Sequence, residues 1–335
     1  MKKINILDCT LRDGGYINNW EFTEDTFNHV IKTYESIDIQ AVEVGILGGK
    51  HGEAFSTRFP DFSAIPYFEK NKQDVLFAVM GTYGDLKKIE IPEQKKVSVN
   101  AIRLAFFKED ATESLKLAKE MMKKGYAVFL QAMATFMYTD EELSELVQNV
   151  NQLKPYAFYM VDSFGTMYPE EVEKMYKLIA SKLNGEIIFG FHAHNNMQLA
   201  FANVMRFIEI ADREVFVDAS VYGMGRGAGN LNMELLLKYM NDNHGTQYNC
   251  DLVMDLFQSD IEEEYRKYGW GYGVPYYYAS VEKVNAVYIW YLHNKGINDY
   301  KQIRKILKEL PEGVRHTLNR DVVDALIEKS YAWEK

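Results

Sequence analysis

Short runs of β-branched, aliphatic and aromatic residues alternate along the chain with longer segments whose apolar positions recur at helical spacing. The runs lie at 4–8, 41–45, 75–80, 101–107, 126–133, 157–162, 186–194 and 214–221. Strands separated by helices run parallel, because each connection must cross over the sheet. Eight strand–helix units within about 250 residues predict an α/β fold, the closed (β/α)8 TIM barrel. An open doubly wound sheet is the alternative, and the number of units disfavours it.

The pattern changes after residue 250. The segment 268–279, YGWGYGVPYYYA, is rich in glycine and tyrosine, and helical patterns follow it at 281–295, 300–310 and 320–329. Ser280 and Gly296 flank the first of these patterns, as residues at helix ends often do. We therefore expect a barrel domain over residues 1–250 and a helical C-terminal extension over residues 251–335 that packs on the barrel.

The composition of the chain disfavours several classes of binding partner. Lys and Arg number 38 and Asp and Glu 48 in the 335 residues, and the net charge of −10 repels phosphate backbones and anionic lipids. No stretch approaches the roughly 18 consecutive apolar residues of a membrane span. The only cysteines, Cys9 and Cys250, are too few for a disulfide framework and fit a reducing compartment. We expect a cytoplasmic protein that binds neither nucleic acid nor membrane.

The first candidate site follows the first predicted strand, where residues 6–20 read ILDCTLRDGGYINNW. In a TIM barrel the chemistry lies where strands end and the following loops begin. Asp8, Arg12 and Asp13 are therefore expected at the catalytic face, and the glycines after them let the backbone turn closely around a ligand. A salt-bridged turn without function is the alternative interpretation.

A second candidate site closes the seventh run, which ends in FHAHNN. Residues two apart on a strand point to the same side, so His192 and His194 face one way. With a carboxylate such as Asp13 they would form a two-histidine, one-carboxylate site that leaves positions open for substrate, as Mn, Fe, Co or Zn can use. A hydrogen-bonded surface pair of histidines is the alternative.

A glycine-rich stretch, DASVYGMGRGAGN at 218–230, follows the eighth run. Its GMGRGA formally matches a dinucleotide-binding fingerprint, but it follows the last strand instead of opening a βαβ unit. We interpret it as a loop at the barrel mouth whose backbone and Asn230 can approach a metal or an anionic substrate. The stretch GILGGKHG at 45–52 fails as a phosphate loop, because His51 stands where Ser or Thr is needed.

Two further features have a structural and a functional interpretation. Arg103 shares one face of the fourth run with Ala101 and Ala105, which places it in the barrel interior, where an arginine needs a partner. That partner is a protein carboxylate or a carboxylate of the substrate. The tyrosines 276–278 pack between helix and barrel, or one of them touches substrate, with Tyr278 as our choice.

Taken together, LDCTLRDGG, FHAHNN and DASVYGMGRGAGN resemble the DRE-TIM metallolyase superfamily (HMGL-like), and most closely its 4-hydroxy-2-oxovalerate aldolase branch. The resemblance implies a divalent metal held by Asp13, His192, His194 and Asn230. It also implies that Arg12 binds a 2-oxo acid and stabilises its enolate, and it matches Glu43 to a glutamate of several relatives. A cation and a guanidinium beside a pyruvate-type substrate make cleavage or formation of the adjacent carbon–carbon bond accessible.

The sequence departs from the family pattern at the expected base. In the aldolases a histidine follows the RDG arginine by four positions, whereas this chain has Tyr16, and a phenol is a poor base at neutral pH. His51, in the loop after the second run, is the hypothesised substitute, and a surface histidine is the alternative. Gly227 replaces the cysteine of the hydroxymethylglutaryl-CoA lyases, and Gly15 and Tyr16 replace the Glu-Gln of Claisen-condensing relatives.

We therefore predict a metal-dependent aldolase that acts on a 4-hydroxy-2-oxo acid through a pyruvate-type enolate. Manganese is the expected ion, with Mg, Co or Zn as alternatives. A Claisen-type acyl-CoA condensing enzyme and a barrel that binds metal and metabolite without turnover are the alternative functions. The expected ligand is a small 2-oxo acid, the aromatic extension is compatible with a homodimer, and the resemblance alone implies an aldehyde dehydrogenase partner.

Overall fold

The computed structural model of the chain describes residues 3–49, 55–68 and 74–331. Within them, eight parallel strands close into a barrel, because β1 pairs with β2 on one side and with β9 on the other. The strands are β1 Ile4–Asp8, β2 Ala41–Leu47, β4 Leu76–Thr82, β5 Ala101–Phe106, β6 Ala127–Ala132, β7 Ala157–Asp162, β8 Ile188–Ala193 and β9 Val215–Ala219. Each predicted run overlaps one strand, and the predicted TIM barrel is confirmed. A short strand, β3 Arg58–Phe59, adds to β2 outside the barrel.

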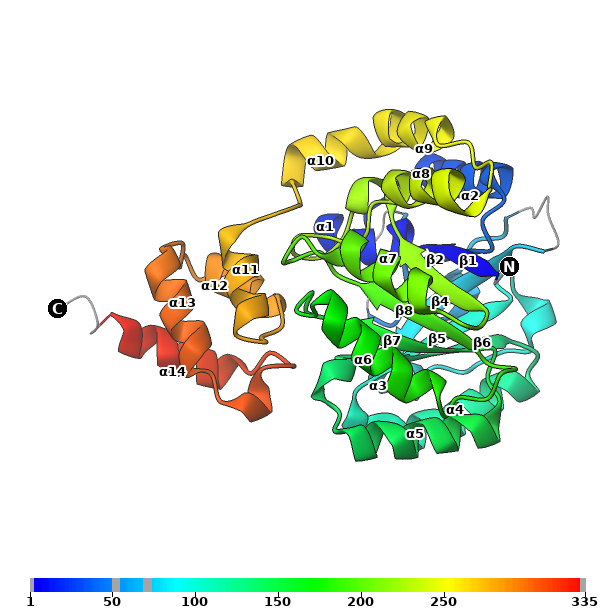
Figure 1. Ribbon diagram of the computed structural model, residues 1–335. Helices are drawn as coiled ribbons and strands as arrows, with labels where there is room; N and C mark the ends of the chain where they lie inside the picture. The colour runs from blue at the N-terminus through cyan, green and yellow to red at the C-terminus, as the bar shows by residue number, and fades with distance from the viewer. Residues whose placement is uncertain (1–2, 50–54, 69–73, 332–335) are drawn as a thin grey trace.

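Helices surround the barrel (Figure 1). They are α2 Glu24–Ile37, α3 Tyr83–Leu86, α4 Ala111–Lys123, α5 Asp140–Leu153, α6 Pro169–Ala180, α7 Ala200–Ile210 and α8 Met233–His244. Their starts follow the capping rules: Thr139 and Glu142 form a capping box at α5, and Pro169 occupies the first turn of α6. None of the described helices combines the length and the apolarity needed to cross a bilayer.

Alternate residues of each strand face the helices and the barrel interior. On β5, Ile102, Leu104 and Phe106 lie in the large hydrophobic core shared with the helices, whereas Ala101 lies in the interior cluster. The ring of Tyr159 helps to fill this interior. A Cβ at position 190 would lie 2.2 Å from Tyr159 Cε2, so β8 has glycine there.

The C-terminal helices divide between two hydrophobic cores. They are α9 Asp251–Leu256, α10 Glu262–Tyr268, α11 Val274–Val281, α12 Val287–Asn294, α13 Tyr300–Glu309 and α14 Arg320–Ser330. Val253 and Leu256 of α9 join the barrel core, whereas residues from Ala279 onward form a second core between α11 and α14. The predicted helical extension is confirmed, and its boundary at residue 250 stays a prediction.

Helices α11 to α14 lie beside the barrel as a separate group (Figure 1). They contact loops that follow the carboxyl ends of strands. Ser280 Oγ donates to the carbonyl of Phe164 after β7 (2.5 Å), and the His316 ring packs on Phe107 after β5, with centroids 5.1 Å apart. This group therefore covers part of the barrel mouth.

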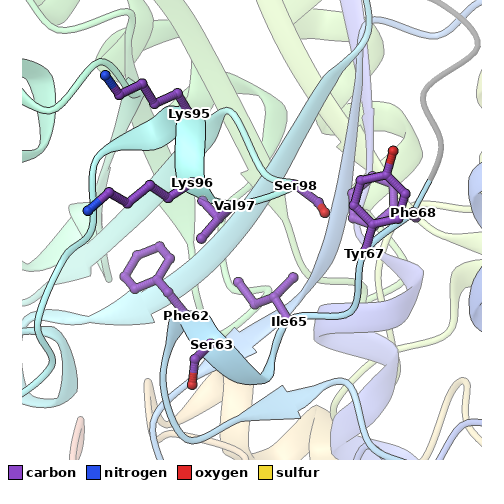
Figure 2. A pocket seen from close by; sticks show the side chains of 9 residues that line it. All are labelled: Phe62, Ser63, Ile65, Tyr67, Phe68, Lys95, Lys96, Val97 and Ser98. Atoms are coloured by element: carbon purple, nitrogen blue, oxygen red, sulfur yellow. The ribbon is translucent and has the colours of Figure 1, made fainter.

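A pocket of about 510 Å³ is lined by residues within 62–68 and 95–98 (Figure 2). Its walls come from segments that precede β4 and β5, so it opens at the amino ends of the strands. Its lining residues are Phe62, Ser63, Ile65, Tyr67, Phe68, Lys95, Lys96, Val97 and Ser98. Catalytic sites of TIM barrels lie at the carboxyl ends of the strands, so this pocket is not at the catalytic face.

Candidate metal centre

The turn after β1 positions the first two candidate residues. Residues Thr10–Gly14 form one turn of π-helix, a local form that is frequent at functional sites, and α1 Gly15–Asn18 follows it. The amide of Asp13 donates to the carbonyl of Cys9 (2.8 Å), and the Trp20 indole nitrogen donates to the carbonyl of Arg12 (2.7 Å). These bonds hold Arg12 and Asp13 almost wholly buried at the end of the strand.

The end of β8 brings the two histidines to the same place. His192 and His194 stand on one face of the strand, with ring centroids 5.0 Å apart. One ligand atom of each histidine and one carboxylate oxygen of Asp13 all lie within 4.8 Å of one another. The distance from His194 Nδ1 to Asp13 Oδ2 is 3.9 Å. The predicted convergence of these strand ends is therefore present in the fold.

The glycine-rich loop adds Asn230 to this cluster. Residues His194 and Asn230 form an isolated β-bridge, and Asn230 Nδ2 donates to Asp13 Oδ2 (2.7 Å) and to the carbonyl of Met224 (3.0 Å). Gly225 lies against the same pair, since a Cβ there would be 2.3 Å from Asn230 Nδ2 and 2.9 Å from Asp13 Oδ2. The loop thus needs glycine at 225 because its backbone touches the cluster.

A network of buried ion pairs in the barrel interior holds the cluster in place. Arg12 Nε donates to Glu43 Oε2 (2.7 Å), and Arg12 Nη1 donates to Asp13 Oδ1. Glu43 Oε2 also accepts from Arg103 Nη1 (3.0 Å). Arg103 Nη2 in turn donates to Asp218 Oδ2, which also accepts from His192 Nδ1 at 2.9 Å. The bond to Asp218 orients the His192 ring and leaves its Nε2 free as a ligand atom.

Burial and neighbouring charges shift the pKa values of the candidate metal ligands. Burial raises the pKa of the Asp13 carboxyl, but Arg12 and the two histidines outweigh it, so the pKa lies well below its ordinary range. Burial lowers the pKa of His194 to about 3, against the opposing effect of Asp13. At neutral pH Asp13 is therefore a carboxylate and His194 a neutral imidazole, which are the forms that bind metal.

The donor set fits a divalent cation. Two imidazoles and one carboxylate are ligands shared by Mn, Fe, Co and Zn, and one amide oxygen adds a hard donor. Among the described residues the buried Asn230 Oδ1 has no hydrogen-bond partner. An unpaired buried oxygen is costly, and a cation beside Asp13 would satisfy it. The buried Arg12 Nη2 is likewise unpaired and is free to donate to a bound anion.

The remaining predicted residues lie around this cluster in different ways. Arg103 is fully buried, pairs with two carboxylates and lies over the Tyr159 ring at 4.9 Å, which favours the structural ion pair over substrate binding. Tyr16 on α1 is 40% exposed and packs edge-on against Trp20. Tyr278 packs against the second core, with Arg304 of α13 over its ring. His51 lies outside the described residues.

Sequence reasoning missed two residues near the cluster. Asp218, the fourth residue of β9, lies on the inward face and orients His192. The alternation of VFVDA carries a signal for it, because a charge at an inward position of a central strand needs a partner. Arg226, in the glycine-rich loop, lies over the ring of Tyr16 with its guanidinium carbon 5.0 Å from the centroid. No local pattern predicts that contact.

Comparison with known proteins agrees with this fold. The sequence model of the HMGL-like family matches residues 3–258, which span every barrel strand and all four candidate ligands. The chain belongs to the HMGL-like family. The resemblance drawn from the three motifs is therefore confirmed.

Several known proteins are similar to this chain over most of its length. A 4-hydroxy-2-oxovalerate aldolase from Pelotomaculum thermopropionicum is 30% identical over 261 residues, which cover 76% of this chain and 75% of the relative. Another, from Geobacillus genomosp. 3, is 28% identical and covers 78% of this chain and 76% of the relative. An oxaloacetate decarboxylase from Mycobacterium tuberculosis is 25% identical, with 76% of each chain covered.

Solved structures show the same architecture. The N-terminal domain of a candidate aldolase from Bacteroides vulgatus superimposes with a TM-score of 0.72 at 29% identity, covering 86% of this chain and 97% of that domain. A hydroxymethylglutaryl-CoA lyase from Bacillus subtilis gives a TM-score of 0.61 at 15% identity, covering 81% of this chain and 94% of the lyase. The second likeness shows the shared fold alone.

Proposed function

We propose that this HMGL-like protein is a divalent-metal-dependent aldolase that cleaves or forms the C3–C4 bond of a 4-hydroxy-2-oxo acid. The observation that carries the proposal is the meeting of Asp13, His192 and His194 at the barrel mouth, beside the unpaired Nη2 of Arg12. The aldolases among its relatives, at 28–30% identity over most of the chain, support the same reaction.

The metal ligands in this proposal are Asp13, His192, His194 and Asn230, and manganese is the expected ion. When bound, a divalent cation supplies Lewis-acid polarisation of the keto oxygen of the substrate. Arg12 is held by Glu43 and Asp13 and directs its free Nη2 to the substrate carboxylate or to the developing enolate oxygen. A preorganised guanidinium in a buried site stabilises that charge without reorganisation.

In the cleavage direction the substrate hydroxyl at C4 loses its proton and the C3–C4 bond breaks. The electron pair of that bond moves to the 2-oxo group as the enolate of pyruvate, and an aldehyde departs. Tyr16 and His51 are the two candidates to accept the hydroxyl proton. Separate Tyr16→Phe and His51→Ala variants distinguish them, because only the variant that lacks the base loses cleavage while it keeps pyruvate enolisation.

A second candidate reaction is decarboxylation of an oxaloacetate-type acid, in which carbon dioxide leaves C3 and the same enolate forms. Tyr16 stands where the aldolases have their basic histidine, and this favours decarboxylation, because loss of carbon dioxide needs no base to deprotonate a hydroxyl. The decarboxylase relative from Mycobacterium tuberculosis supports this alternative. Both reactions place the same demand on Arg12 and the metal ligands.

The first test measures the metal content of the purified protein and of an Asp13→Ala variant, with Asp25→Ala at an exposed residue of α2 as the matched control. Deuterium exchange into the methyl group of pyruvate then reports the enolate alone. We expect exchange to need both the metal and Arg12, and to fall at least about 100-fold in Arg12→Met, since such a donor contributes roughly 3 kcal/mol. Metal binding without exchange would refute the aldolase and the decarboxylase together.

If exchange occurs, product analysis separates the two reactions. Pyruvate and acetaldehyde from 4-hydroxy-2-oxovalerate identify the aldolase, whereas pyruvate and carbon dioxide from oxaloacetate identify the decarboxylase. Oxaloacetate also decays with free metal ions, so the metal-loaded Arg12→Met variant supplies the background rate. Only the excess over that rate counts as enzymatic decarboxylation.

A further inference from the structure

Arg226 is a half-buried cation at the edge of the site. It lies in the glycine-rich loop that follows β9, and it forms no ion pair with a carboxylate of the described residues. Its guanidinium carbon stands 5.0 Å from the centroid of the Tyr16 ring. The Tyr16 ring in turn packs edge-on against Trp20 at 4.6 Å. Stacking on an aromatic face fixes a guanidinium while leaving its N–H donors available.

The loop fixes Arg226 next to the metal centre. Its neighbour Gly225 touches Asn230 and Asp13, because a Cβ at 225 would lie within 3 Å of both side chains. Arg226 is also close enough to lower the pKa of both Asp13 and His194 electrostatically. The backbone before Arg226 is therefore pinned to the ligands while its side chain extends over α1.

Arg226 gives the centre one positive charge more than a bound metal ion and a pyruvate carboxylate would balance. The buried network holds three carboxylates, Asp13, Glu43 and Asp218, against the guanidiniums of Arg12 and Arg103, which gives −1. A divalent cation brings the sum to +1, which matches the single carboxylate of a pyruvate unit. With Arg226 the sum is +2. Within the described residues Arg226 has no carboxylate partner, and a half-buried cation beside a candidate metal centre is typical of a ligand-binding group.

We propose that Arg226, stacked on Tyr16, binds an anionic group at the far end of the substrate. The inference rests on the proposed function and narrows its substrate class to 4-hydroxy-2-oxo acids with a carboxylate or phosphate beyond C4. Cleavage of such an acid breaks C3–C4, returns the electron pair to the pyruvate enolate and releases an aldehyde that carries the anion. In this subsite the ring of Tyr16 is a platform for Arg226, and binding of the anionic group does not need the Tyr16 hydroxyl.

Two matched pairs of acids test the subsite. The first pair, 2-oxoglutarate and 2-oxovalerate, differ only in a terminal carboxylate or methyl group and lack the 4-hydroxyl, so calorimetry measures binding without cleavage. The second pair, 4-hydroxy-2-oxoglutarate and 4-hydroxy-2-oxovalerate, carry the same difference in cleavable form. A phosphorylated 4-hydroxy-2-oxo acid forms a third arm that distinguishes phosphate from carboxylate.

The wild type should bind 2-oxoglutarate at least about 10-fold more tightly than 2-oxovalerate. Arg226→Met should abolish that preference by weakening 2-oxoglutarate alone, and Arg226→Lys should keep part of it. Tyr16→Phe should keep it fully, because the ring face remains. Equal binding of the two acids by the wild type, or an equal loss for both in Arg226→Met, would overturn the subsite.

The calorimetric test separates this inference from the proposed function. If pyruvate exchange and cleavage are absent while the preference for the dicarboxylate depends on Arg226, the reaction is wrong and the subsite stands. If exchange and cleavage of 4-hydroxy-2-oxovalerate proceed and Arg226→Met changes kcat/KM of both cleavable acids alike, the reaction stands and the subsite is wrong. Circular dichroism of each variant confirms that it is folded.

Discussion

At the scale of single residues, Gly225 determines whether the glycine-rich loop can pack against Asn230 and Asp13. An alanine Cβ at this position would meet Asn230 Nδ2 at 2.3 Å and Asp13 Oδ2 at 2.9 Å, closer than such atoms can approach. The side chains must then move apart, so Gly225→Ala should weaken binding of Mn²⁺ at least about 10-fold, the size expected when ligand orientation is lost. Metal titration checks it, with unfolding curves to verify that the variant is folded.

Gly185→Ala is the matched control for this substitution, because nothing lies within 4 Å of a Cβ added at 185. It should leave metal affinity unchanged. Unaltered Mn²⁺ binding in Gly225→Ala as well would mean that the glycine-rich loop stands further from the ligands than the contact with Asp13 indicates.

The buried carboxyl of Asp8 couples stability to pH. Burial raises its pKa from 3.8 to about 7, although Thr10 donates to both of its oxygens. Between these values the folded state keeps a proton that the unfolded state has lost, so rising pH favours unfolding. The contribution of Asp8 is full below pH 3.8 and disappears as the pH passes about 7. Its size is on the order of 4 kcal/mol.

Asp8→Asn should therefore reduce the fall in unfolding free energy between pH 4 and pH 8, as measured by urea denaturation. Carboxyls whose pKa is lowered, such as Asp218, act in the opposite sense, so the difference between variant and wild type isolates Asp8. The exposed Asp25 supplies the control, Asp25→Asn, which should leave the slope unchanged. Parallel pH profiles for wild type and Asp8→Asn would contradict a raised pKa in the folded state.

At the scale of elements, the C-terminal segment braces the glycine-rich loop. The indole nitrogen of Trp270 donates to the carbonyl of Tyr222 (2.9 Å), a residue of this loop with a positive φ of 51°. Trp270→Phe keeps an aromatic ring but removes this donor, at a cost of about 1 kcal/mol. We expect amide exchange at Gly229 and Asn230 to accelerate roughly fivefold, measured by hydrogen–deuterium exchange.

Trp290→Phe is the comparison for this element, because Trp290 is exposed on α12. Exchange in the loop should be the same as in the wild type. If Trp270→Phe leaves the loop amides equally protected, the loop is held by its own bonds, such as that from the Asn230 amide to the carbonyl of Gly223 (2.9 Å).

Some features of these elements could be predicted from the sequence, and others could not. The strands and the motif positions were predictable because the apolar runs and the ends of strands are local signals. The sequence therefore sufficed to predict that Asp13, His192 and His194 lie close together. The pairing of Arg103 with Asp218 was not predictable, because β5 and β9 are not neighbours and the contact spans 115 residues. The stacking of Arg226 on Tyr16 depends likewise on loop conformations that no periodicity encodes.

At the scale of the whole molecule, the two hydrophobic cores predict two levels of stability. Residues between Ala279 and Ile327 pack among themselves, and their contacts with the barrel mouth include the hydrogen bond from Ser280 Oγ to the carbonyl of Phe164. Regions with separate cores can open separately. The C-terminal helices should therefore exchange their core amides at a lower free energy of opening than β5 does.

Ser280→Ala tests this division, because it removes the donor while the carbonyl of Phe164 keeps its bond from Asn196 Nδ2 (2.9 Å). We expect the opening free energy of the C-terminal core to fall by about 1 kcal/mol, with no change in the β5 amides. Ser36→Ala, at an exposed serine of α2, should alter neither. A fall of equal size in both cores would mean that barrel and extension unfold as one cooperative unit, and the covering of the mouth would then be permanent.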